Sequence, residues 1–419
     1  MEYEWIKSNF MFMFPGVGSQ YFGMGRELYK SYPIVRETFE EASDELKIDF
    51  HNLCFEENNG ELNLLEYTKP ALVCLCVAIY RVFLQQTGIE PKFGMGYSLG
   101  EYTALCCAGV LRYADTLQIV HQRALIVNEV AANVHGTMAW VVNIERNMAK
   151  NICNRINQEG YEIYISSYDS QEKLSVSGTN EGIQQFARIV EDAGGMVIPI
   201  KMSGPFHSPL MKEAAVRLRE VLNQFKFQSS RFDVIANRDA SVYGITREGI
   251  IENLVMQLVE PIMWDRGVNY AAAHGIKFAI ELGPKNVLKF LLRDNTRGIR
   301  AYSVEKAEDI QRLLDDITLP LMEYGDILKK SLGVVVSTKN QCNDKERYES
   351  HVAGPYNQLI GLYKESNETG KCTGAAVKEA VDLLQVILQT KGSSKELIDA
   401  RIRKLLNGRV LLEDTRLIY

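Results

Sequence analysis

The chain has 419 residues, a formal net charge of −6 and a hydrophobic share of 46%. This length exceeds one typical domain and predicts two or three structural units with a sizeable apolar core. The acidic balance gives no reason to expect nucleic-acid binding, and an acidic protein partner would need a local basic patch.

The N-terminal segment and the cysteines indicate a cytoplasmic protein. Residues 1–10 lack a basic region followed by an apolar stretch, so no signal peptide is expected. No apolar run is expected to reach the roughly 20 residues that span a bilayer, so no membrane contact is predicted. The eight cysteines form no CxxC pair and no His/Cys cluster with ligand spacing, which predicts buried free thiols and no metal site.

The first 135 residues alternate between short apolar strands and amphipathic helices. Strands are predicted over 12–14 and 92–96, and helices over 26–30, 34–46, 70–86, 102–110 and 114–131. A glycine-rich turn, Pro15 to Gln20, follows the first strand. This alternation predicts an α/β core with parallel strands.

The pattern changes near Gly136 and changes back near residue 203. Between these points, strands are predicted over 138–142, 164–167, 174–177 and 196–201, and a helix over 182–193. These units indicate an inserted subdomain, 136–202, within a core made of 10–135 and 203–318. In the second part of the core, helices are predicted over 208–225, 248–258, 264–273 and 286–293, and strands over 233–236 and 277–281.

After about Leu319 the composition shifts to mixed polar and charged residues with short apolar patches. Helical patterns return over 375–389 and 395–406, and the second opens with a capping-box pattern, Ser393 to Glu396. We therefore expect residues 320–419 to form a mostly helical C-terminal extension, whose role the sequence does not indicate.

The segment Gly96-Tyr-Ser98-Leu-Gly100 lies between a predicted strand and a predicted helix. A GxSxG sequence alone is a weak signal, because a serine in a flexible turn is the commoner case. The strand–turn–helix context favours a nucleophile elbow, with Ser98 at a helix N-terminus. There the backbone amide of Leu99 can donate a hydrogen bond to a developing oxyanion.

A nucleophilic serine needs a base, and His207 is the strongest candidate among the six histidines. It lies in Gly204-Pro-Phe-His207-Ser-Pro, a loop between a predicted strand and a predicted helix, where sites are commonly built. A surface histidine is the alternative interpretation. The other five histidines lie in helical patterns or ordinary loops and are interpreted as structural or surface residues.

Arg123 and the turn from Gly16 to Gly18 are weaker candidates. A lone helical arginine is usually solvated or paired, but Arg123 could bind a substrate carboxylate through two hydrogen bonds. The turn could supply a second oxyanion amide, or it could be a plain tight turn. It has neither a P-loop lysine nor the GxGxxG pattern of dinucleotide-binding proteins.

Together, these motifs resemble malonyl-CoA:acyl carrier protein transacylases and the acyltransferase domains of polyketide synthases. The resemblance runs in the family's order over about residues 10–310, and it includes FPGQGSQ-like and GHSLGEYxA…AGV-like segments. The segments that carry it are Phe14 to Gln20, Gly96 to Ala104 with Cys107 to Val110, Phe206 to Met211, Gln257 to Trp264 and Glu281 to Pro284.

The resemblance implies roles for four side chains. Ser98 is expected to be the acyl-accepting nucleophile and His207 its general base. The main-chain carbonyl of Gln257 is expected to orient that histidine in place of a triad aspartate. Arg123 is expected to pair with the free carboxylate of malonate.

The resemblance also implies an oxyanion hole and further substrate-binding positions. The amides of Val17 and Leu99 are expected to form the oxyanion hole, and Phe206, Tyr97 and Gln20 to contact substrate. This sequence departs from the family at Val17, where Gln is usual, and at Tyr97, where His is usual. Gly204-Pro205 also differs from the more common His-Ala.

The family fold is α/β, with an α/β-hydrolase-like large subdomain that carries a ferredoxin-like insertion. The implied reaction moves a malonyl group from malonyl-CoA, through a seryl ester, to the phosphopantetheine thiol of an acyl carrier protein or a polyketide synthase carrier domain. Coenzyme A thioester is then the substrate, and no cofactor is expected. A free-standing chain with divergent motifs and an unexplained tail favours service in trans to polyketide or hybrid polyketide/peptide synthesis, with fatty-acid synthesis also open.

Two other functions stay open at this point. One is an acyl hydrolase that clears stalled acyl groups from carrier proteins, which the presence of Arg123 disfavours. The other is a non-catalytic docking protein for carrier proteins, which an intact pair of Ser98 and His207 disfavours.

Overall fold

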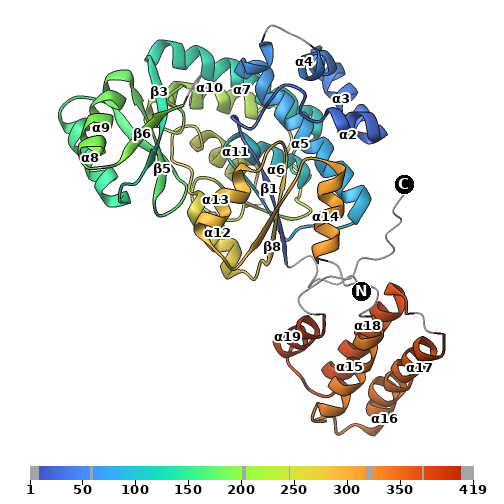
Figure 1. Ribbon diagram of the computed structural model, residues 1–419. Helices are drawn as coiled ribbons and strands as arrows, with labels where there is room; N and C mark the ends of the chain where they lie inside the picture. The colour runs from blue at the N-terminus through green and yellow to red at the C-terminus, as the bar shows by residue number, and fades with distance from the viewer. Residues whose placement is uncertain are drawn as a thin grey trace.

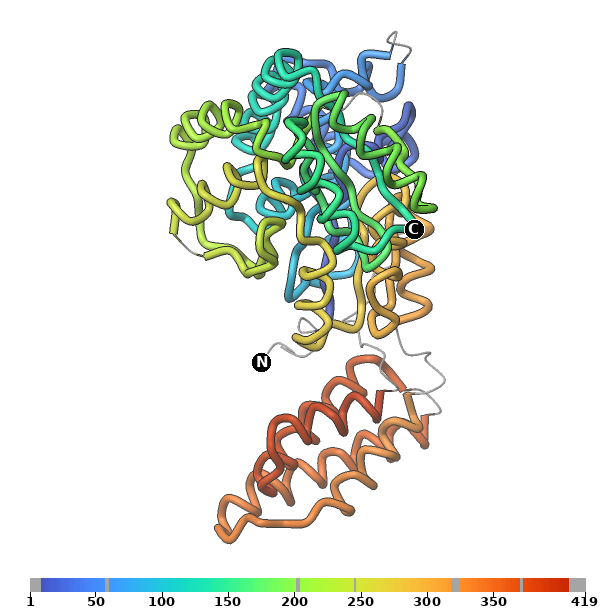
Figure 2. The backbone as a smooth tube through the Cα atoms, turned by 90° about the vertical axis from the view of Figure 1, so that its left-hand side faces the viewer, coloured from blue at the N-terminus to red at the C-terminus, as the bar shows by residue number. Residues whose placement is uncertain are grey.

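The computed structural model describes residues 9–56, 60–200, 204–244, 246–317, 324–369 and 372–406. In these ranges the chain forms an α/β body of two subdomains and a separate helical lobe near the C-terminus (Figure 1). The view turned by 90° shows the same lobe below the body (Figure 2). This is the class of architecture that the sequence predicted.

A five-stranded parallel sheet forms the centre of the large subdomain. Its strands lie in the order β7 (Asp233–Ile235), β2 (Phe93–Gly96), β1 (Phe10–Phe14), β8 (Phe278–Leu282) and β9 (Arg300–Val304). Each neighbouring pair is parallel. The pairing of Phe14 with Gly96 brings the carboxyl ends of β1 and β2 together at one edge of the sheet.

Strand β1 explains why helices cover both faces of this sheet. Its residues Phe10, Phe12 and Phe14 pack into one apolar cluster with α5 (Leu65–Thr87), whereas Met11 and Met13 pack into another with α12 (Trp264–Ala273). All five side chains are fully buried. Because successive side chains of a strand point to opposite faces, an apolar strand of this kind requires cover on both sides.

Helices therefore surround the sheet (Figure 1). Those of the large subdomain are α2 (Arg26–Ser31), α3 (Pro33–Leu46), α4 (Phe50–Phe55), η1 (Glu61–Asn63), α5 (Leu65–Thr87), α6 (Leu99–Cys107), α7 (Tyr113–Val134), η2 (Pro209–Met211), α10 (Lys212–Leu222), α11 (Arg247–Met256), α12 (Trp264–Ala273), α13 (Val287–Asn295) and α14 (Ala307–Ile317).

Helix α5 corrects two expectations. It begins at Leu65, so Pro70 lies inside it rather than at its start. Proline cannot donate to the carbonyl four residues earlier, and that carbonyl, of Glu66, instead accepts a hydrogen bond of 3.0 Å from His121 Nδ1.

The same helix is also long and apolar enough to cross a membrane, contrary to the expectation that no such run exists, but 83% of its apolar stretch is buried inside the protein. Its composition is that of a core helix.

The small subdomain is an antiparallel sheet with two helices. Its strands β3 (Gly136–Val142), β4 (Ile163–Tyr168), β5 (Lys173–Thr179) and β6 (Met196–Pro199) lie in the order β4-β5-β3-β6. Helices α8 (Arg146–Gln158) and α9 (Asn180–Asp192) pack together and complete a βαββαβ chain order. This topology confirms the ferredoxin-like insertion. The predicted strand over 196–201 ends at Pro199, and residues 201–203 lie outside the described residues.

The C-terminal lobe is a helical bundle with its own apolar core. It contains α15 (Tyr324–Ser337), α16 (Lys345–Tyr348), the π-helix η4 (Glu349–Ala353), α17 (Gly354–Thr369), α18 (Gly374–Thr390) and α19 (Lys395–Leu405). The buried apolar residues of these helices form one cluster, separate from the clusters of the body. The mostly helical extension is therefore confirmed. The predicted boundaries near 318 and 320, and the chain after 406, lie outside the described residues.

Several elements are absent from the sequence-based prediction or differ from it. The elements that were not predicted are α4, η1, α8, β9, α14, α15, α16, η4 and α17. The helix predicted over 208–225 is a short 3-10 turn followed by α10, which starts only at Lys212. Ser208 is extended there, with φ −144° and ψ 160°, because the backbone first has to leave the loop that carries His207.

Candidate active site

The turn between β2 and α6 holds Ser98 in a strained conformation. Its φ of 51° and ψ of −105° lie in a region that non-glycine residues rarely adopt. A Cβ at Gly96 would lie 1.9 Å from the carbonyl carbon of Gly100, and one at Gly100 would lie 1.9 Å from the carbonyl oxygen of Phe14. Both glycines are therefore required for the sharp turn, which is the geometry of a nucleophile elbow.

A chain of hydrogen bonds connects Ser98, His207 and Gln257. The Oγ of Ser98 lies 2.8 Å from Nε2 of His207, and Nδ1 of His207 lies 2.6 Å from the main-chain carbonyl oxygen of Gln257. A carbonyl only accepts, so Nδ1 carries a proton in this arrangement and Nε2 of the neutral ring accepts from the Ser98 hydroxyl. This is the orientation that a general base for Ser98 requires.

The environment of His207 keeps its imidazole neutral. The residue is 3% exposed. Burial is the main cause that lowers its pKa to about 3, and the positive charge of Arg123 lowers it further. The hydrogen bond from the ring to the Gln257 carbonyl opposes these effects and raises the pKa only in part. At neutral pH the ring therefore has a free Nε2 lone pair for the serine proton.

Arg123 reaches the same site from α7. It is 3% exposed, and its Nη2 donates a hydrogen bond of 3.1 Å to the side-chain oxygen of Gln257. Its guanidinium carbon lies 5.3 Å from the centroid of the Tyr102 ring. The Nε of Arg123 is buried and has no partner. A buried arginine with a free donor is ready to bind an anionic group.

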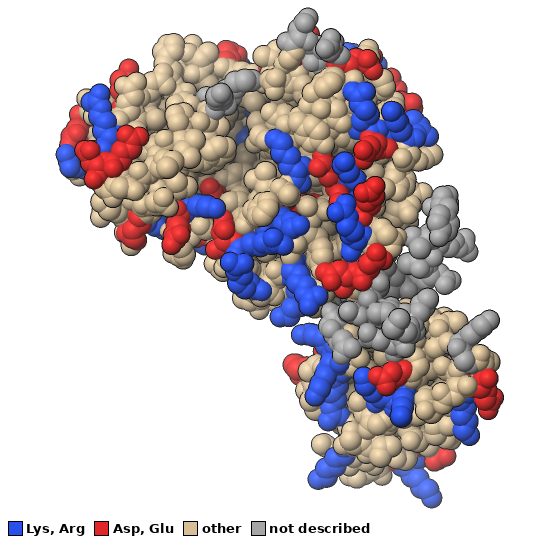
Figure 3. All heavy atoms as spheres, viewed as in Figure 1, with Lys and Arg blue, Asp and Glu red and all other residues tan. Residues whose placement is uncertain are grey.

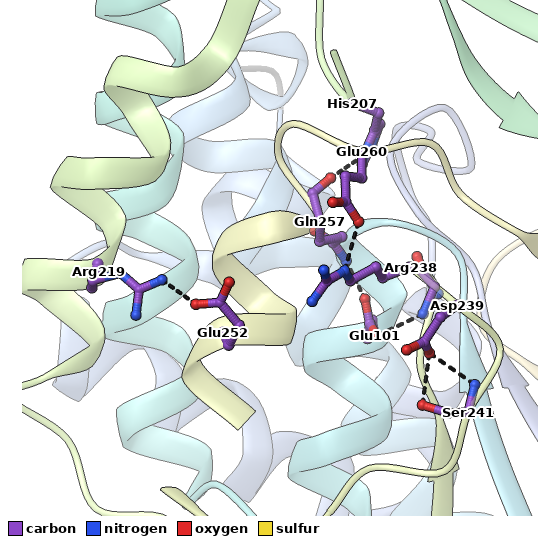
Figure 4. A network of polar contacts seen from close by, with 10 residues as sticks. Glu101, His207, Arg219, Arg238, Asp239, Ser241, Glu252, Gln257 and Glu260 are labelled. Carbon is purple, nitrogen blue, oxygen red and sulfur yellow. Dashed lines mark hydrogen bonds and ion pairs between the residues drawn. The ribbon is translucent and has the colours of Figure 1, made fainter. Parts of the chain in front are cut away.

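A second network of hydrogen bonds, centred on Glu101 and Gln257, includes residues that sequence reasoning missed (Figure 4). Glu101 accepts from the side-chain Nε2 of Gln257 at 2.5 Å and from the amide of Asn237 at 2.8 Å. The side chain of Asn237 in turn accepts from the Ser98 amide at 2.8 Å. Burial raises the pKa of Glu101 to about 7, against hydrogen bonds from Asn237, Tyr243 and Gln257 that lower it. The side chain of Gln257 also donates to the Ser98 carbonyl at 2.8 Å.

The missed residues had modest sequence signals. Glu101 directly follows the GxSxG segment on the helix that begins there, and Asn237 follows the carboxyl end of strand β7. The carboxyl ends of parallel strands meet at one edge of a sheet, so a polar residue after β7 was a candidate neighbour of the elbow.

The two proposed oxyanion donors come from the glycine-rich turn, which carries Val17, and from the elbow, which carries Leu99. A Cβ at Gly16 would be 2.5 Å from the Tyr97 carbonyl oxygen and 3.8 Å from the Leu99 amide nitrogen, so the glycine-rich turn lies against the elbow. Within the described parts of the chain, neither the Val17 nor the Leu99 amide donates a hydrogen bond. Two free amides beside one nucleophile are what an oxyanion hole needs.

The other predicted substrate-binding residues lie in different surroundings. Tyr97 donates from its hydroxyl to Asp169 of the small subdomain at 2.7 Å. Gln20 accepts from the Gly18 amide at 2.7 Å and so stabilises the glycine-rich turn. Phe206 precedes His207, and its ring lies 5.5 Å from Nζ of Lys69. Of these three, Phe206 is therefore next to the base, and Tyr97 is tied to the small subdomain.

The described residues include no group of three or more His, Cys, Asp and Glu side chains arranged to hold a metal ion. All eight cysteines are free.

Comparison with known proteins gives consistent matches. The sequence model of a family described as the acyl transferase domain matches residues 11–318. A Bacillus subtilis protein named malonyl CoA-acyl carrier protein transacylase is 30% identical over 390 residues, 92% of this chain and 97% of its own. The Escherichia coli (strain K12) protein of the same name is 35% identical over 287 residues, 68% of this chain and 92% of its own.

Solved structures match about three quarters of the chain. A type II PKS acyl-carrier protein in complex with its malonyl-transacylase gives a TM-score of 0.71 at 31% identity, covering 74% of this chain and 99% of that one. An acyl carrier protein S-malonyltransferase from Vibrio cholerae gives 0.70 at 30% identity, covering 73% and 99%. The alignment with the Bacillus subtilis protein covers 390 residues of this chain, whereas the family model matches only residues 11–318. The similarity to that protein therefore continues into the C-terminal bundle.

Proposed function

The chain belongs to the acyl transferase family and is an acyltransferase, and we propose that it carries a malonyl group from malonyl-CoA, as a Ser98 ester, to the phosphopantetheine thiol of an acyl carrier protein. The observation that carries this proposal is the hydrogen-bonded chain from Ser98 through His207 to the Gln257 carbonyl, with Arg123 buried beside Gln257.

In the first half-reaction Nε2 of His207 takes the proton of the Ser98 hydroxyl as Oγ attacks the thioester carbonyl carbon. The tetrahedral oxyanion accepts hydrogen bonds from the amides of Val17 and Leu99. The carbon–sulfur bond then breaks, and His207 returns its proton to the departing thiolate. The products are coenzyme A and a malonyl ester of Ser98.

In the second half-reaction the thiol of the carrier protein gives its proton to His207, and the sulfur attacks the ester carbonyl. The oxyanion is held by the same two amides. Ser98 leaves with the proton from His207, and the malonyl thioester departs on the carrier. The guanidinium of Arg123 pairs with the malonyl carboxylate throughout and disfavours neutral acyl groups, because a buried cation left unpaired costs free energy.

We further propose that the acceptor is a polyketide or hybrid polyketide/peptide carrier that is served in trans. One similar structure, a type II PKS acyl-carrier protein in complex with its malonyl-transacylase, supports this proposal. On the face seen in Figure 3, Lys and Arg side chains gather over the region of α12 and α13, a surface suited to an acidic partner. The enzyme would act in the cytoplasm and need no cofactor beyond its thioester substrate.

The test is intact mass measurement after incubation with malonyl-CoA. We expect one malonyl adduct on the wild type and none on Ser98→Ala. The control is Ser350→Ala, at an exposed serine of the C-terminal bundle, which should gain one adduct like the wild type. If the wild type gains no adduct, the proposed acyl transfer is refuted and the protein is better explained as a non-catalytic docking protein for carrier proteins. Adding carrier proteins from polyketide and fatty-acid systems then separates transfer from hydrolysis: if free malonate forms at the same rate with and without a carrier, the protein is a hydrolase.

A further inference from the structure

Lys69 is a buried basic side chain that neither half-reaction uses. It lies on α5 immediately before Pro70 and is 2% exposed. Its Nζ lies over the ring of Phe206, 5.5 Å from the ring centroid. Among the described residues its ammonium group forms no hydrogen bond and no ion pair. A buried lysine side chain with no carboxylate bonded to it is costly, so its presence calls for an explanation.

The surroundings of Lys69 are positive. Burial and then the positive charge of Arg123 hold the pKa of Lys69 well below its usual range, and the carboxylate of Glu66 raises it only in part. Glu66 is only partly buried and already accepts a hydrogen bond of 2.9 Å from Asn128. The protein itself therefore provides no dedicated anion for this lysine.

Lys69 and Arg123 act on the same imidazole. The positive charges of both lower the pKa of His207, and Coulomb interactions fall with distance. Helices α5 and α7, which carry the two cations, pack against each other. Arg123 also has a buried Nε without a partner. Two cations with unused donors thus lie near His207, and Ser98 lies 2.8 Å from that ring.

A lysine of the C-terminal bundle shows what a buried structural lysine looks like in this protein. Lys391 is 7% exposed, and its Nζ donates to the carbonyl oxygens of Val335 and Thr338 at 2.7 and 2.9 Å. It therefore joins two segments of the bundle. Lys69 makes no such bonds, so a structural role of this kind does not explain it.

We infer that Lys69 is a second binding group for the carboxylate of the acyl donor, which binds between the Lys69 ammonium and the Arg123 guanidinium. This inference rests on the proposed malonyl transfer and adds a specificity-determining residue to it. The incoming carboxylate supplies the negative charge that the pocket lacks and accepts from donors that are otherwise unused. An acetyl group has no carboxylate and leaves both cations unpaired.

The test compares Lys69→Met, which keeps the length of the side chain without its charge, with the matched variant Lys391→Met. The rate of Ser98 acylation is measured with malonyl-CoA and acetyl-CoA. For Lys69→Met we expect the malonyl-to-acetyl ratio of kcat/KM to fall about tenfold to hundredfold, mostly through KM for malonyl-CoA. We expect an unchanged or higher Tm, because an unpaired buried cation is removed. For Lys391→Met we expect an unchanged ratio and a lower Tm.

A malonyl-to-acetyl ratio in Lys69→Met equal to that of the wild type overturns the inference. If Lys69→Met does not fold, Lys69→Gln replaces it with the same two readouts. A wild type that forms no malonyl ester at all refutes the proposed function instead. The two failures are therefore distinguishable, because the second is seen before any lysine variant is made.

Discussion

The large subdomain and the C-terminal bundle both surround an apolar core with helices, but they differ in how they use buried polar groups. In the bundle, Lys391 and Ser331 donate to backbone carbonyls, and these bonds hold helices and their ends in place. In the large subdomain, Gln257 forms hydrogen bonds with His207, with Arg123 and with the Ser98 carbonyl of the elbow. Arg123 also keeps a buried donor without a partner.

This difference indicates where binding energy is available. A polar group that is satisfied by the backbone contributes to stability and has nothing left for a ligand. A buried group without a partner lowers stability until a ligand pairs with it, which is typical of functional sites. The following predictions test whether chemistry is confined to the large subdomain, in order of decreasing expected effect.

Ser98→Ala should abolish acyl loading, because the described chain holds no other serine in a comparable strand–turn–helix elbow. The measurement is the intact mass after incubation with malonyl-CoA, with circular dichroism as the check on folding. A folded mutant that still gained one malonyl group would move the nucleophile to another residue.

His207→Ala should slow acylation about 10²–10⁴-fold, which is the usual contribution of a general base. Pre-steady-state release of coenzyme A at neutral pH measures it. The control is His351→Ala, since this histidine lies in the bundle, on η4. If His207→Ala acylates at nearly the normal rate, the base is elsewhere, and His121 is the first residue to examine.

Arg123→Ala should lose malonyl transfer and keep or gain turnover of acetyl-CoA. Removing one member of a buried charge pair typically costs about 2–5 kcal/mol, and the penalty that the unpaired arginine imposes on acetyl disappears with it. Side-by-side assays with malonyl-, methylmalonyl- and acetyl-CoA follow the acyl-enzyme by mass. Arg81→Ala is a matched control, because that arginine pairs with Glu41 away from the site. A mutant that retains the full malonyl preference contradicts the proposed role of Arg123.

The rate of acylation should not fall near pH 6.5, where an ordinary histidine base becomes protonated. His207 has a pKa of about 3, below the ordinary value of 6.5, so the ring stays neutral and kcat/KM for acylation should stay nearly level from pH 8 to about pH 5. The same shift means that its contribution to stability is present above about pH 6.5 and is lost as the pH falls toward 3. Stopped-flow acylation across this range is the measurement, and a half-maximal rate near pH 6.5 would count against a neutral, buried base.

Removing the bundle should have the smallest effect on the reaction itself. Relatives such as the Escherichia coli protein align over 92% of their own length with only 68% of this chain, so a family member without a comparable extension is a complete protein. A chain ending near residue 320 is expected to acylate Ser98 within a few-fold of the full-length rate. A loss of acylation in a folded truncated protein would show that the bundle supports the active site.

The local sequence was sufficient to predict the elbow and the general architecture. Ser98 and its glycines are contiguous, and the requirement for Gly96 and Gly100 follows from the sharp turn itself. Strand β1 was predicted because all its residues are apolar, and the change at Gly136 separated the two subdomains. Helix α8 was missed although its buried residues Ala149, Ile152, Cys153 and Ile156 recur at helical spacing, so this pattern in the sequence could have predicted it.

What the tertiary structure decided is which distant groups meet. The 2.6 Å contact between His207 and the Gln257 carbonyl depends on the path of the chain after α11, and apart from the family resemblance no composition or periodicity in the sequence specifies it. Glu101 and Asn237 are brought together by the pairing of β2 with β7. Lys69 reads in the sequence as one charge at the start of an apolar helix. It becomes a candidate specificity residue only because α5 packs against α7. The physical reason is that the burial of a side chain, its protonation and the partners available to it depend on its neighbours in space, which the local sequence does not specify.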